Sequence, residues 1–140
     1  MKKYLLSAEP LSNDLAVLIL RVGFGLLMAR YGLMKFQDFG NMSANFMDWL
    51  GLGPKVTLGL VVFAELGCAV LVVFGLFTRL ALIPLIVTML VAFFVAHAKD
   101  PFDVKEHSLV FLIAYIAIFL SGAGRYSLDW YLRKDRFIKF

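Results

Sequence analysis

The sequence predicts an all-α, membrane-embedded four-helix bundle with short interfacial helices. Of its 140 residues, 61% are hydrophobic, well above the roughly 45–50% of a soluble domain. Four apolar stretches are each long enough to cross a hydrocarbon core about 30 Å thick as a helix. None of them alternates apolar and polar residues as a membrane-spanning strand would. We therefore expect one four-span domain over residues 1–140 and no separate soluble domain.

The four predicted spans are separated by links of unequal length. They cover residues 14–36, 57–77, 79–98 and 107–123. The basic start Met-Lys-Lys resembles that of a signal peptide, but the apolar run after it is too long and no small-residue cleavage site closes it. The first span is therefore interpreted as uncleaved. Pro84 removes the backbone hydrogen bond to Leu80 and should bend the third span, where Thr88 could bind a freed carbonyl.

Basic residues are unevenly divided between the two sides of the predicted membrane. One side would carry Lys2, Lys3, Arg79, Arg125, Arg133, Lys134, Arg136 and Lys139, and the other Lys35, Lys55, Lys99 and Lys105. Because loop lysines and arginines resist translocation, both termini are predicted to be cytoplasmic. The net charge of +4 needs no nucleic-acid partner to explain it.

The link between the first two spans, FQDFGNMSANFMDWLGLGP, is too long for a simple turn and is predicted to contain a short helix on the outer surface. Ser43 could cap this helix. Its apolar face would contain Phe46, Met47 and Leu50, and its end would lie at Gly51, Gly53 and Pro54. The segment would anchor the bundle as an aromatic belt or cover an outer pocket as a lid.

A second short helix is predicted after the fourth span. Gly122 and Gly124 stop that span, and Ser127 could cap a helix over residues 128–138. The apolar residues of this helix fall on roughly one side and its basic residues on the other. This pattern suits a helix lying on an anionic inner leaflet, with docking of a cytosolic partner as the alternative.

The first span carries a stripe of basic and small residues on one helix face. Spacings of three and four join Arg21, Gly25, Met28, Gly32 and Lys35. The glycines allow close approach of a neighbouring helix, and a cation facing lipid in mid-span is unfavourable, so the stripe is predicted to point inward. Arg30 lies about 180° around the helix from Arg21 and should face elsewhere.

Other polar groups lie near the outer ends of the third and fourth spans. His97, Glu106 and His107 would form a group of two imidazoles and a carboxylate. Their spacing matches no metal-ligand signature, so we predict a hydrogen-bond cluster and no metal site. Cys68 is interpreted as a packing residue, with a redox role that needs an external thiol partner as the alternative.

Several short motifs, in this order, resemble the DoxX family. After an arginine and a glycine early in span one come Gly32-Leu33-Met34-Lys35, Ala64-Glu65-Leu66-Gly67, Gly75-Leu76-Phe77-Thr78-Arg79, His97 and Gly122-Ala123-Gly124-Arg125-Tyr126-Ser127-Leu128-Asp129. The likeness covers roughly residues 15–130, and the last motif and the Gly-Leu-Phe-Thr-Arg turn are specific. In two departures, Tyr31 stands where the family often has a histidine, and Arg30 has no counterpart.

The resemblance implies a small, multi-pass protein of the bacterial inner membrane. The family is named after a subunit linked to archaeal quinone-reducing or quinol-oxidising complexes, and other members are described alongside thiol-redox and oxidative-stress partners. With the residue analysis, it yields candidate ligand-binding residues Arg21, Tyr31, Lys35, Glu65 and His97. Residues expected to shape the fold or topology are Arg79, Pro84, Gly122, Gly124, Arg125 and Asp129. No catalytic residue is assigned.

Glu65 interrupts the apolar run VVFAELGCAVLVV near the middle of the second span. A carboxylate there is either protonated or met by a cation. Depth in the membrane favours Arg30, whereas the resemblance favours the stripe of Arg21 and Lys35, and we predict the stripe. The site would be an ion pair that fixes helix packing, or a polar site that binds a quinone head group or passes a proton.

Three functions follow for a chain that is not a self-contained enzyme. The first is an accessory subunit of a quinone-linked oxidoreductase, which binds quinone but no covalent cofactor. The others are a noncatalytic scaffold of a membrane complex and, as the alternative, a small-solute or proton pathway. The chain lacks paired histidines for haem and has too few cysteines for an iron–sulfur cluster. Expected partners are membrane lipid, a redox partner protein and further copies of the chain.

Overall fold

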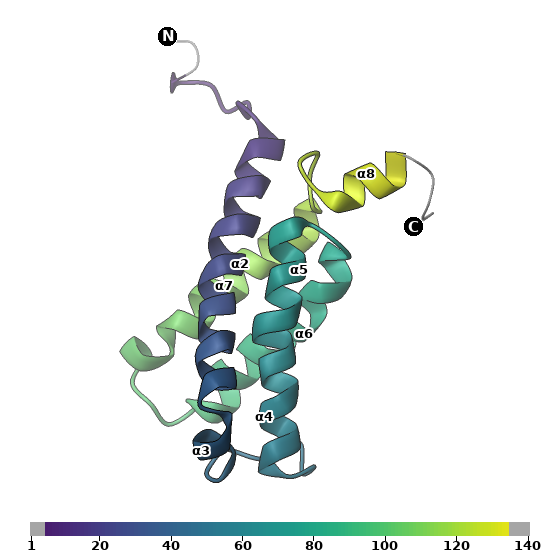
Figure 1. Cartoon of the computed structure of the whole chain (residues 1–140). Helices are drawn as coiled ribbons and strands as arrows, with labels where there is room; N and C mark the ends of the chain where they lie inside the picture. The colour runs from purple at the N-terminus through teal and green to yellow at the C-terminus, as the bar shows by residue number, and fades with distance from the viewer. Residues whose placement is uncertain (1–4, 135–140) are drawn as a thin grey trace.

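The computed structural model describes residues 5–134, which form helices and turns without a strand (Figure 1). Four helical segments are long and apolar enough to cross a membrane, Asn13–Gln37, Pro54–Phe74, Thr78–Ala96 and Phe102–Ser121. They confirm the predicted all-α architecture with four membrane helices. Part of the predicted charge asymmetry rests on Lys2, Lys3, Arg136 and Lys139, which lie outside the described residues.

The first span is the unbroken helix α2, Asn13–Gln37. The Ser12 hydroxyl caps it by accepting a hydrogen bond from the Leu15 N–H at 3.2 Å, which satisfies one of the free donors of the first turn. The helix agrees with the predicted span to within one residue at each end. After Asp38 the chain forms one further short helix, α3, Phe39–Ser43.

The second span consists of three helical segments in one continuous rod, α4 Pro54–Val62, η1 Phe63–Cys68 and α5 Ala69–Phe74. The middle segment η1 is a π-helix, which has wider turns than an α-helix. The span ends three residues earlier than predicted, because Gly75 adopts a left-handed conformation with φ of 70°. Such a residue commonly terminates a helix.

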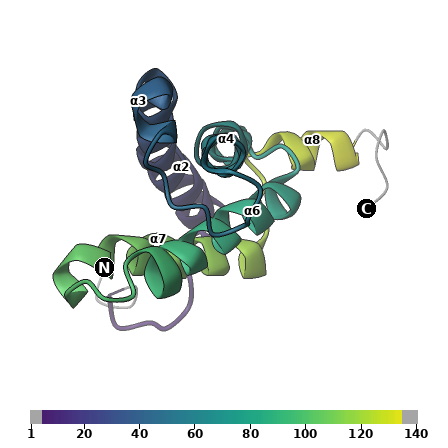
Figure 2. The same cartoon turned by 90° about the horizontal axis from the view of Figure 1, so that it is seen from below.

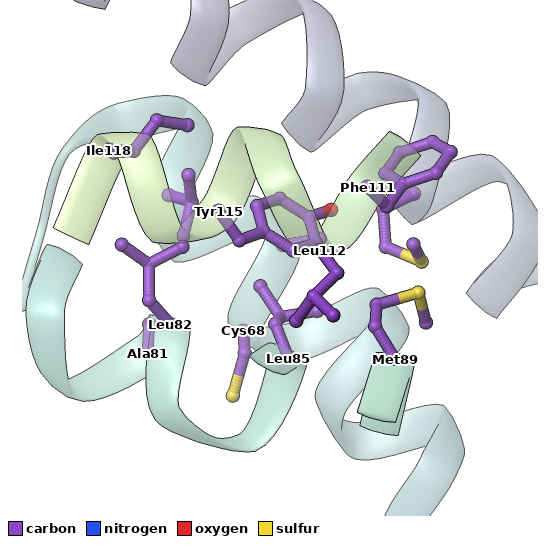
Figure 3. Close-up of a cluster of buried hydrophobic side chains, with 12 residues drawn as sticks. Cys68, Ala81, Leu82, Leu85, Met89, Phe111, Leu112, Tyr115 and Ile118 are labelled. Carbon is purple, nitrogen blue, oxygen red and sulfur yellow. The ribbon is translucent and has the colours of Figure 1, made fainter. Parts of the chain in front are cut away.

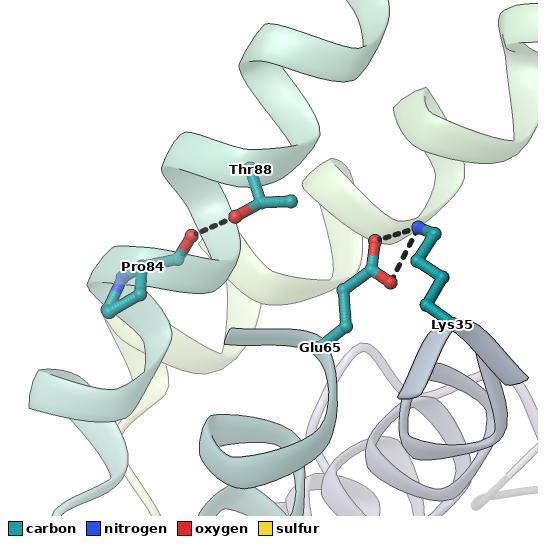
Figure 4. Close-up of polar contacts among 4 residues, drawn as sticks. All are labelled: Lys35, Glu65, Pro84 and Thr88. Carbon is teal, nitrogen blue, oxygen red and sulfur yellow. Dashed lines mark hydrogen bonds and ion pairs between the residues drawn. The ribbon is translucent and has the colours of Figure 1, made fainter. Parts of the chain in front are cut away.

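The third span begins as α6, Thr78–Val91, and ends in a second π-helix, η2, Ala92–Ala96. Pro84 lies inside α6, as predicted. The Thr88 hydroxyl donates a hydrogen bond to the Pro84 carbonyl at 2.7 Å (Figure 4). The expectation that Thr88 would bind the carbonyl freed on Leu80 is therefore wrong, since a threonine in a helix reaches the carbonyl four residues before it.

The fourth span is α7, Phe102–Ser121, which starts five residues before the predicted position His107. Pro101 directly precedes the helix, and Asp103 lies in its first turn. A carboxylate there interacts favourably with the positive end of the helix dipole. Polar residues that were expected to be a link thus form the first turns of the helix.

The four spans are arranged in a ring. The first span packs along η1 and α5, α5 and η1 contact α6, α6 packs against α7, and α7 returns to α2. The view from below shows α6 and α7 side by side, across from α2 and α4 (Figure 2). We name the end with the start of α2, the Gly75 turn and α8 the terminal side, and the end with α3 the loop side (Figure 1).

The centre of the ring is apolar (Figure 3). The buried cluster consists of Met28, Cys68, Ala69, Val72, Ala81, Leu82, Leu85, Met89, Phe111, Leu112, Tyr115 and Ile118. Large apolar side chains also cover the outside of the helices, among them Leu26, Phe63, Leu80 and Ile113. A bundle that is apolar inside and outside is suited to lipid as its solvent, so the chain is a membrane protein.

The predicted interfacial helix between the first two spans is wrong in position. Ser43 is the last residue of α3 instead of a cap before a helix, and residues 44–53 form no helix. The competing interaction comes from Asp48, whose carboxylate accepts hydrogen bonds from the Thr57 hydroxyl at 2.8 Å and the Gly53 N–H at 2.9 Å. These contacts hold residues 48–53 against the start of α4, so the segment cannot also form its own helix.

The Asp48 contacts predict a pH dependence. Hydrogen bonds, first from Thr57 and then from backbone N–H groups, lower the pKa of Asp48 below its ordinary value. The charged Asp48 carboxylate therefore stabilises the fold fully above its unfolded-state pKa of about 3.9. This contribution is lost as the pH falls through the lower pKa that Asp48 has in the folded protein. Between pH 6 and 2 we expect Asp48→Asn to remove part of the fall in thermal midpoint. The control is Glu9→Gln, which removes an exposed carboxylate that makes no side-chain hydrogen bond in the described structure. Identical profiles for both variants would contradict this assignment.

A second short helix, α8, Leu128–Lys134, lies on the terminal side (Figure 1). Gly122 and Gly124, with φ of 81° and 82°, turn the chain after α7, and the Ser127 hydroxyl accepts a hydrogen bond from the Trp130 N–H at 3.2 Å. The predicted glycine stop and serine cap are confirmed. The predicted continuation of this helix to residue 138 lies outside the described residues.

Asp129 of α8 caps the start of the third span. Its two carboxylate oxygens accept hydrogen bonds from the Phe77 N–H at 2.7 Å and the Thr78 N–H at 2.9 Å. The Asp129 N–H donates to the Gly75 carbonyl at 2.9 Å. Because the first N–H groups of a helix have no partner within it, Asp129 joins α8 firmly to α6.

Two arginines complete the terminal side. The Arg79 Nε–H donates to the Phe119 carbonyl at 2.9 Å, which links the start of α6 to the end of α7. The backbone N–H of Arg125 donates to Asp14 Oδ1 at 3.1 Å. Residues that the sequence suggested as structural thus connect three spans at one end of the bundle.

Candidate functional site

The most buried ion pair among residues 5–134 joins Lys35 of α2 to Glu65 of η1 (Figure 4). The Lys35 ammonium Nζ lies 2.7 Å from Oε1 and 2.6 Å from Oε2 of Glu65. The Glu65 side chain is 4% exposed and that of Lys35 is 28% exposed. The prediction that the stripe of α2 supplies the cation is confirmed for Lys35. Arg30 is exposed, as expected for a residue on another face of α2.

The pair depends on a close approach of α2 to the π-helix. A β-carbon added at Gly32 would lie 2.5 Å from the Leu66 nitrogen and 2.6 Å from the Glu65 carbonyl carbon. Only a glycine allows this contact between backbones. π-helical turns occur frequently at functional sites, and here the turn carries the one buried carboxylate of the described residues.

Aromatic rings from α2 and α7 lie beside the ion pair. The ring of His107 meets the ring of Tyr31 edge-on at 4.7 Å and that of Phe111 at 5.0 Å. Both Glu65 and Lys35 interact electrostatically with His107. We call Lys35, Glu65, Tyr31 and His107 the loop-side site. Tyr31 was a predicted candidate, whereas the sequence analysis assigned His107 to a different group.

The aromatic group continues inward from the loop-side site. The Phe111 ring meets those of Phe24 and Tyr115 at 5.3 Å and 5.8 Å. The Tyr115 hydroxyl donates to the Phe24 carbonyl at 3.3 Å. Its polar atom is thus bound to the backbone of α2, and the rings give the site an apolar inner wall.

His97 lies outside the loop-side site. Its Nδ1 is 2.7 Å from Asp100 Oδ2, and both side chains are exposed. This local pair, three residues apart at the end of η2, gives His97 a different hydrogen-bond partner from the predicted Glu106, whereas His97 does interact electrostatically with His107. Within residues 5–134, no three His, Cys, Asp or Glu side chains are placed to hold a metal ion.

Arg21 occupies a different place from the one predicted. Its side chain is fully buried and makes no ion pair with Glu65. Its Nη1 donates to the carbonyls of Val72 and Val73, each at 3.1 Å, and its Nη2 donates to the Tyr126 carbonyl at 2.5 Å. The last carbonyls of a helix lack partners and form the negative end of its dipole. Arg21 therefore binds the end of α5 on the terminal side.

Cys68 is almost fully buried in the apolar core, in agreement with the packing interpretation. It follows Glu65 in η1, and its side chain belongs to the cluster that contains Leu85 and Leu112. Cys68 therefore does not extend the loop-side site.

Comparison with known proteins gives two matches. The family model described as DoxX matches residues 16–98. A protein of Bacillus subtilis (strain 168), named "Putative oxidoreductase CatD", is 30% identical over 126 residues, which cover 89% of this chain and 92% of that protein. No solved structure matches the chain significantly.

Proposed function

Because the chain belongs to the DoxX family, we propose that it is an accessory or scaffold subunit of a quinone-linked redox system in the bacterial inner membrane. The name of the Bacillus subtilis relative supports a redox role. In the sequence, the two termini and the turn at Arg79 together carry eight basic residues, against four at the other ends of the spans, so the terminal side would face the cytoplasm, since such residues resist translocation. The loop-side site would then face outward and bind the quinone head group.

The observation that carries this proposal is the Lys35–Glu65 pair next to aromatic rings. An ammonium has three N–H donors. The two carboxylate oxygens of Glu65 take up at most two of those of Lys35. A further donor of the partly exposed Lys35 is therefore free to bind a carbonyl oxygen. The His107 and Tyr31 rings, which meet edge-on beside the ion pair, would give the flat ring of a quinone an aromatic surface to pack against.

The donor set of the loop-side site fits a quinone head group. Lys35 would bind one carbonyl, and Tyr31 and His107 have polar atoms that could hold a proton near it. A bound quinone would supply reversible two-electron, two-proton chemistry. The residues of this chain would bind and orient it, and a partner protein would exchange the electrons. Homo-oligomers of the chain are compatible with this role.

A proton or small-solute pathway is the alternative function, and it needs a continuous polar route. Between Glu65 and Arg21 the described core contains Met28, Ala69 and Val72. The Tyr115 hydroxyl and the Thr88 hydroxyl are both bound to backbone carbonyls. We therefore prefer the accessory redox role.

The proposal predicts that Glu65→Gln lowers the quinone retained by the purified full-length protein about tenfold, the scale of a lost charge-assisted hydrogen bond. Glutamine cannot hold the Lys35 ammonium at two anionic oxygens, so the donor loses its position. Quinone extracted from the protein and quantified by mass spectrometry gives the measurement. Thermal unfolding of the same samples checks that the bundle persists.

Glu106→Gln is the matched control, because Glu106 is an exposed carboxylate at the loop-side end of α7. It should retain quinone as the unmodified protein does. If the unmodified protein retains no quinone above a detergent blank, or if Glu65→Gln retains as much as Glu106→Gln, the quinone site is wrong. If Glu65→Gln instead dissociates the bundle, the pair serves packing.

A further inference from the structure

A separate pocket of about 640 Å³ opens on the terminal side. It lies between the start of α6, the end of α7 and the helix α8. Three guanidinium side chains line it, those of Arg79, Arg125 and Arg133. This pocket is at the opposite end of the bundle from the loop-side site, and the proposed redox role does not use it.

The carboxylates of the pocket are already occupied by the backbone. Asp14 accepts from the Arg125 N–H, and Asp129 accepts from the N–H groups of Phe77 and Thr78. Within residues 5–134, none of the three pocket arginines has a carboxylate within 4.0 Å of its side chain. The pocket thus has an excess of positive charge and donors that are free for an anionic ligand.

The arginines have space around them. Gly122, which has no side chain, lies beside the Arg79 guanidinium. A β-carbon added there would lie 3.4 Å from Arg79 Nη2, so the glycine leaves this side of the guanidinium open. Only the Nε–H of Arg79 is used, by the Phe119 carbonyl, so both terminal NH₂ groups remain available. The Arg125 guanidinium lies 5.9 Å from the centre of the Trp130 ring. Guanidinium groups bind phosphate oxygens in pairs, so three guanidinium side chains that line one pocket suit a phosphodiester.

An apolar surface leads away from the arginines into the membrane. Phe77, Leu80 and Ile83 line the charged pocket, and they also line a second pocket of about 260 Å³. That second pocket continues between the second and third spans to Cys68 and Phe63, beside Pro84. A ligand that spans both pockets has an anionic head and a long apolar chain.

We propose that these two pockets form a binding site for one anionic phospholipid. The phosphodiester binds Arg79, Arg125 and Arg133, and an acyl chain lies along Leu80 and Ile83 toward Phe63. Both pockets lie on the outer surface of a membrane protein, where lipid has direct access. Basic pockets between membrane helices bind anionic head groups elsewhere. The occupant is therefore a phospholipid of the leaflet on the terminal side.

Tryptophan fluorescence tests this site in the full-length protein. Trp49→Phe leaves Trp130 as the only tryptophan of the chain, and Trp130 lines the charged pocket. Phosphatidylglycerol with brominated acyl chains is titrated into the protein in neutral detergent, and brominated phosphatidylcholine serves as the uncharged comparison. We expect phosphatidylglycerol to quench Trp130 at a much lower mole fraction.

A charge-matched pair of variants identifies the responsible residues. Neutralising two basic contacts with Arg125→Gln and Arg133→Gln should raise the half-quenching concentration of phosphatidylglycerol roughly thirtyfold. Neither side chain is needed for a hydrogen bond within the described fold. The control variant Arg30→Gln with Lys55→Gln removes the same charge on the loop side and should change the value less than twofold. Native mass spectrometry then counts the bound lipids.

Three results would overturn the lipid site. Equal quenching by phosphatidylcholine would remove the role of the head-group charge. An equal rise of the half-quenching concentration of phosphatidylglycerol in both double variants would show that lipid binding depends on the net charge of the protein alone. Displacement of the brominated lipid by inorganic phosphate at matched concentration would indicate a free-phosphate site without a role for the acyl chain.

Discussion

Replacing Arg21 with methionine is expected to lower the free energy of unfolding by about 3 kcal/mol or more, since each buried acceptor left unpaired costs about 1–3 kcal/mol. The carbonyls of Val73 and Tyr126 would lose this donor, whereas that of Val72 would keep a hydrogen bond from the Gly75 N–H at 3.1 Å. Methionine keeps much of the apolar volume of the side chain, so the loss would reflect the hydrogen bonds. Unfolding in mixed micelles by titration with dodecyl sulfate measures the difference.

Arg30→Met is the control for this prediction. It removes an exposed arginine from the same helix and should change the free energy of unfolding by no more than about 0.5 kcal/mol. Arg21→Lys should fall between the two variants, because one ammonium cannot reach three carbonyls with the planar geometry of a guanidinium. Equal stability of Arg21→Met and Arg30→Met would show that the Arg21 contacts contribute nothing.

A single methyl group at Gly32 is expected to produce the second large effect. The added β-carbon of Gly32→Ala would lie 2.5 Å from the Leu66 nitrogen, and a backbone atom cannot move aside as the end of a side chain can. Overpacking of this kind costs about 1–3 kcal/mol. The helices must separate, so Lys35 should also lose its contact with Glu65. The midpoint temperature of thermal unfolding and the amount of retained quinone should therefore decrease together.

Gly23→Ala provides the matched control on the same helix, because an added β-carbon there has nothing within 4 Å. Alanine is the better helix former by up to about 1 kcal/mol, so this variant should be neutral or stabilising. The opposite signs of two identical substitutions, nine residues apart, would identify packing against η1 as the cause. A Gly32→Ala protein as stable as Gly23→Ala would rule out the close approach.

Most of the fold could be predicted because its signals lie within single segments. Each span is a long apolar run, Pro84 is inside the third span, and Gly122 and Gly124 end the fourth. The inward face of Lys35 also followed from helical spacing. The prediction for the link at residues 38–53 is wrong because Asp48 binds Gly53 and Thr57 at the start of the next helix, and the apolar periodicity of the link carries no signal of such a contact.

The site was predicted less completely because it depends on distances between helices. The sequence contains Arg21 and Glu65, but it does not reveal that the end of α5 offers its carbonyls to Arg21. The π-helix at Glu65 has no signature in local composition. His107 was grouped with His97 because both are near span ends, whereas the start of α7 at Phe102 brings His107 next to Tyr31. A predicted start of the fourth span at Phe102 would place His107 inside the helix, where it could contact Tyr31.

The Arg21 contacts also bear on biosynthesis. During synthesis from the N-terminus, the first span enters the membrane before any of its acceptors exist. The carbonyls of Val72 and Val73 follow with the second span, and that of Tyr126 arrives only after the fourth span is complete. The buried guanidinium thus gains the last of these three acceptors only at the end of translation, so the last turn of the chain closes the bundle that its first helix begins.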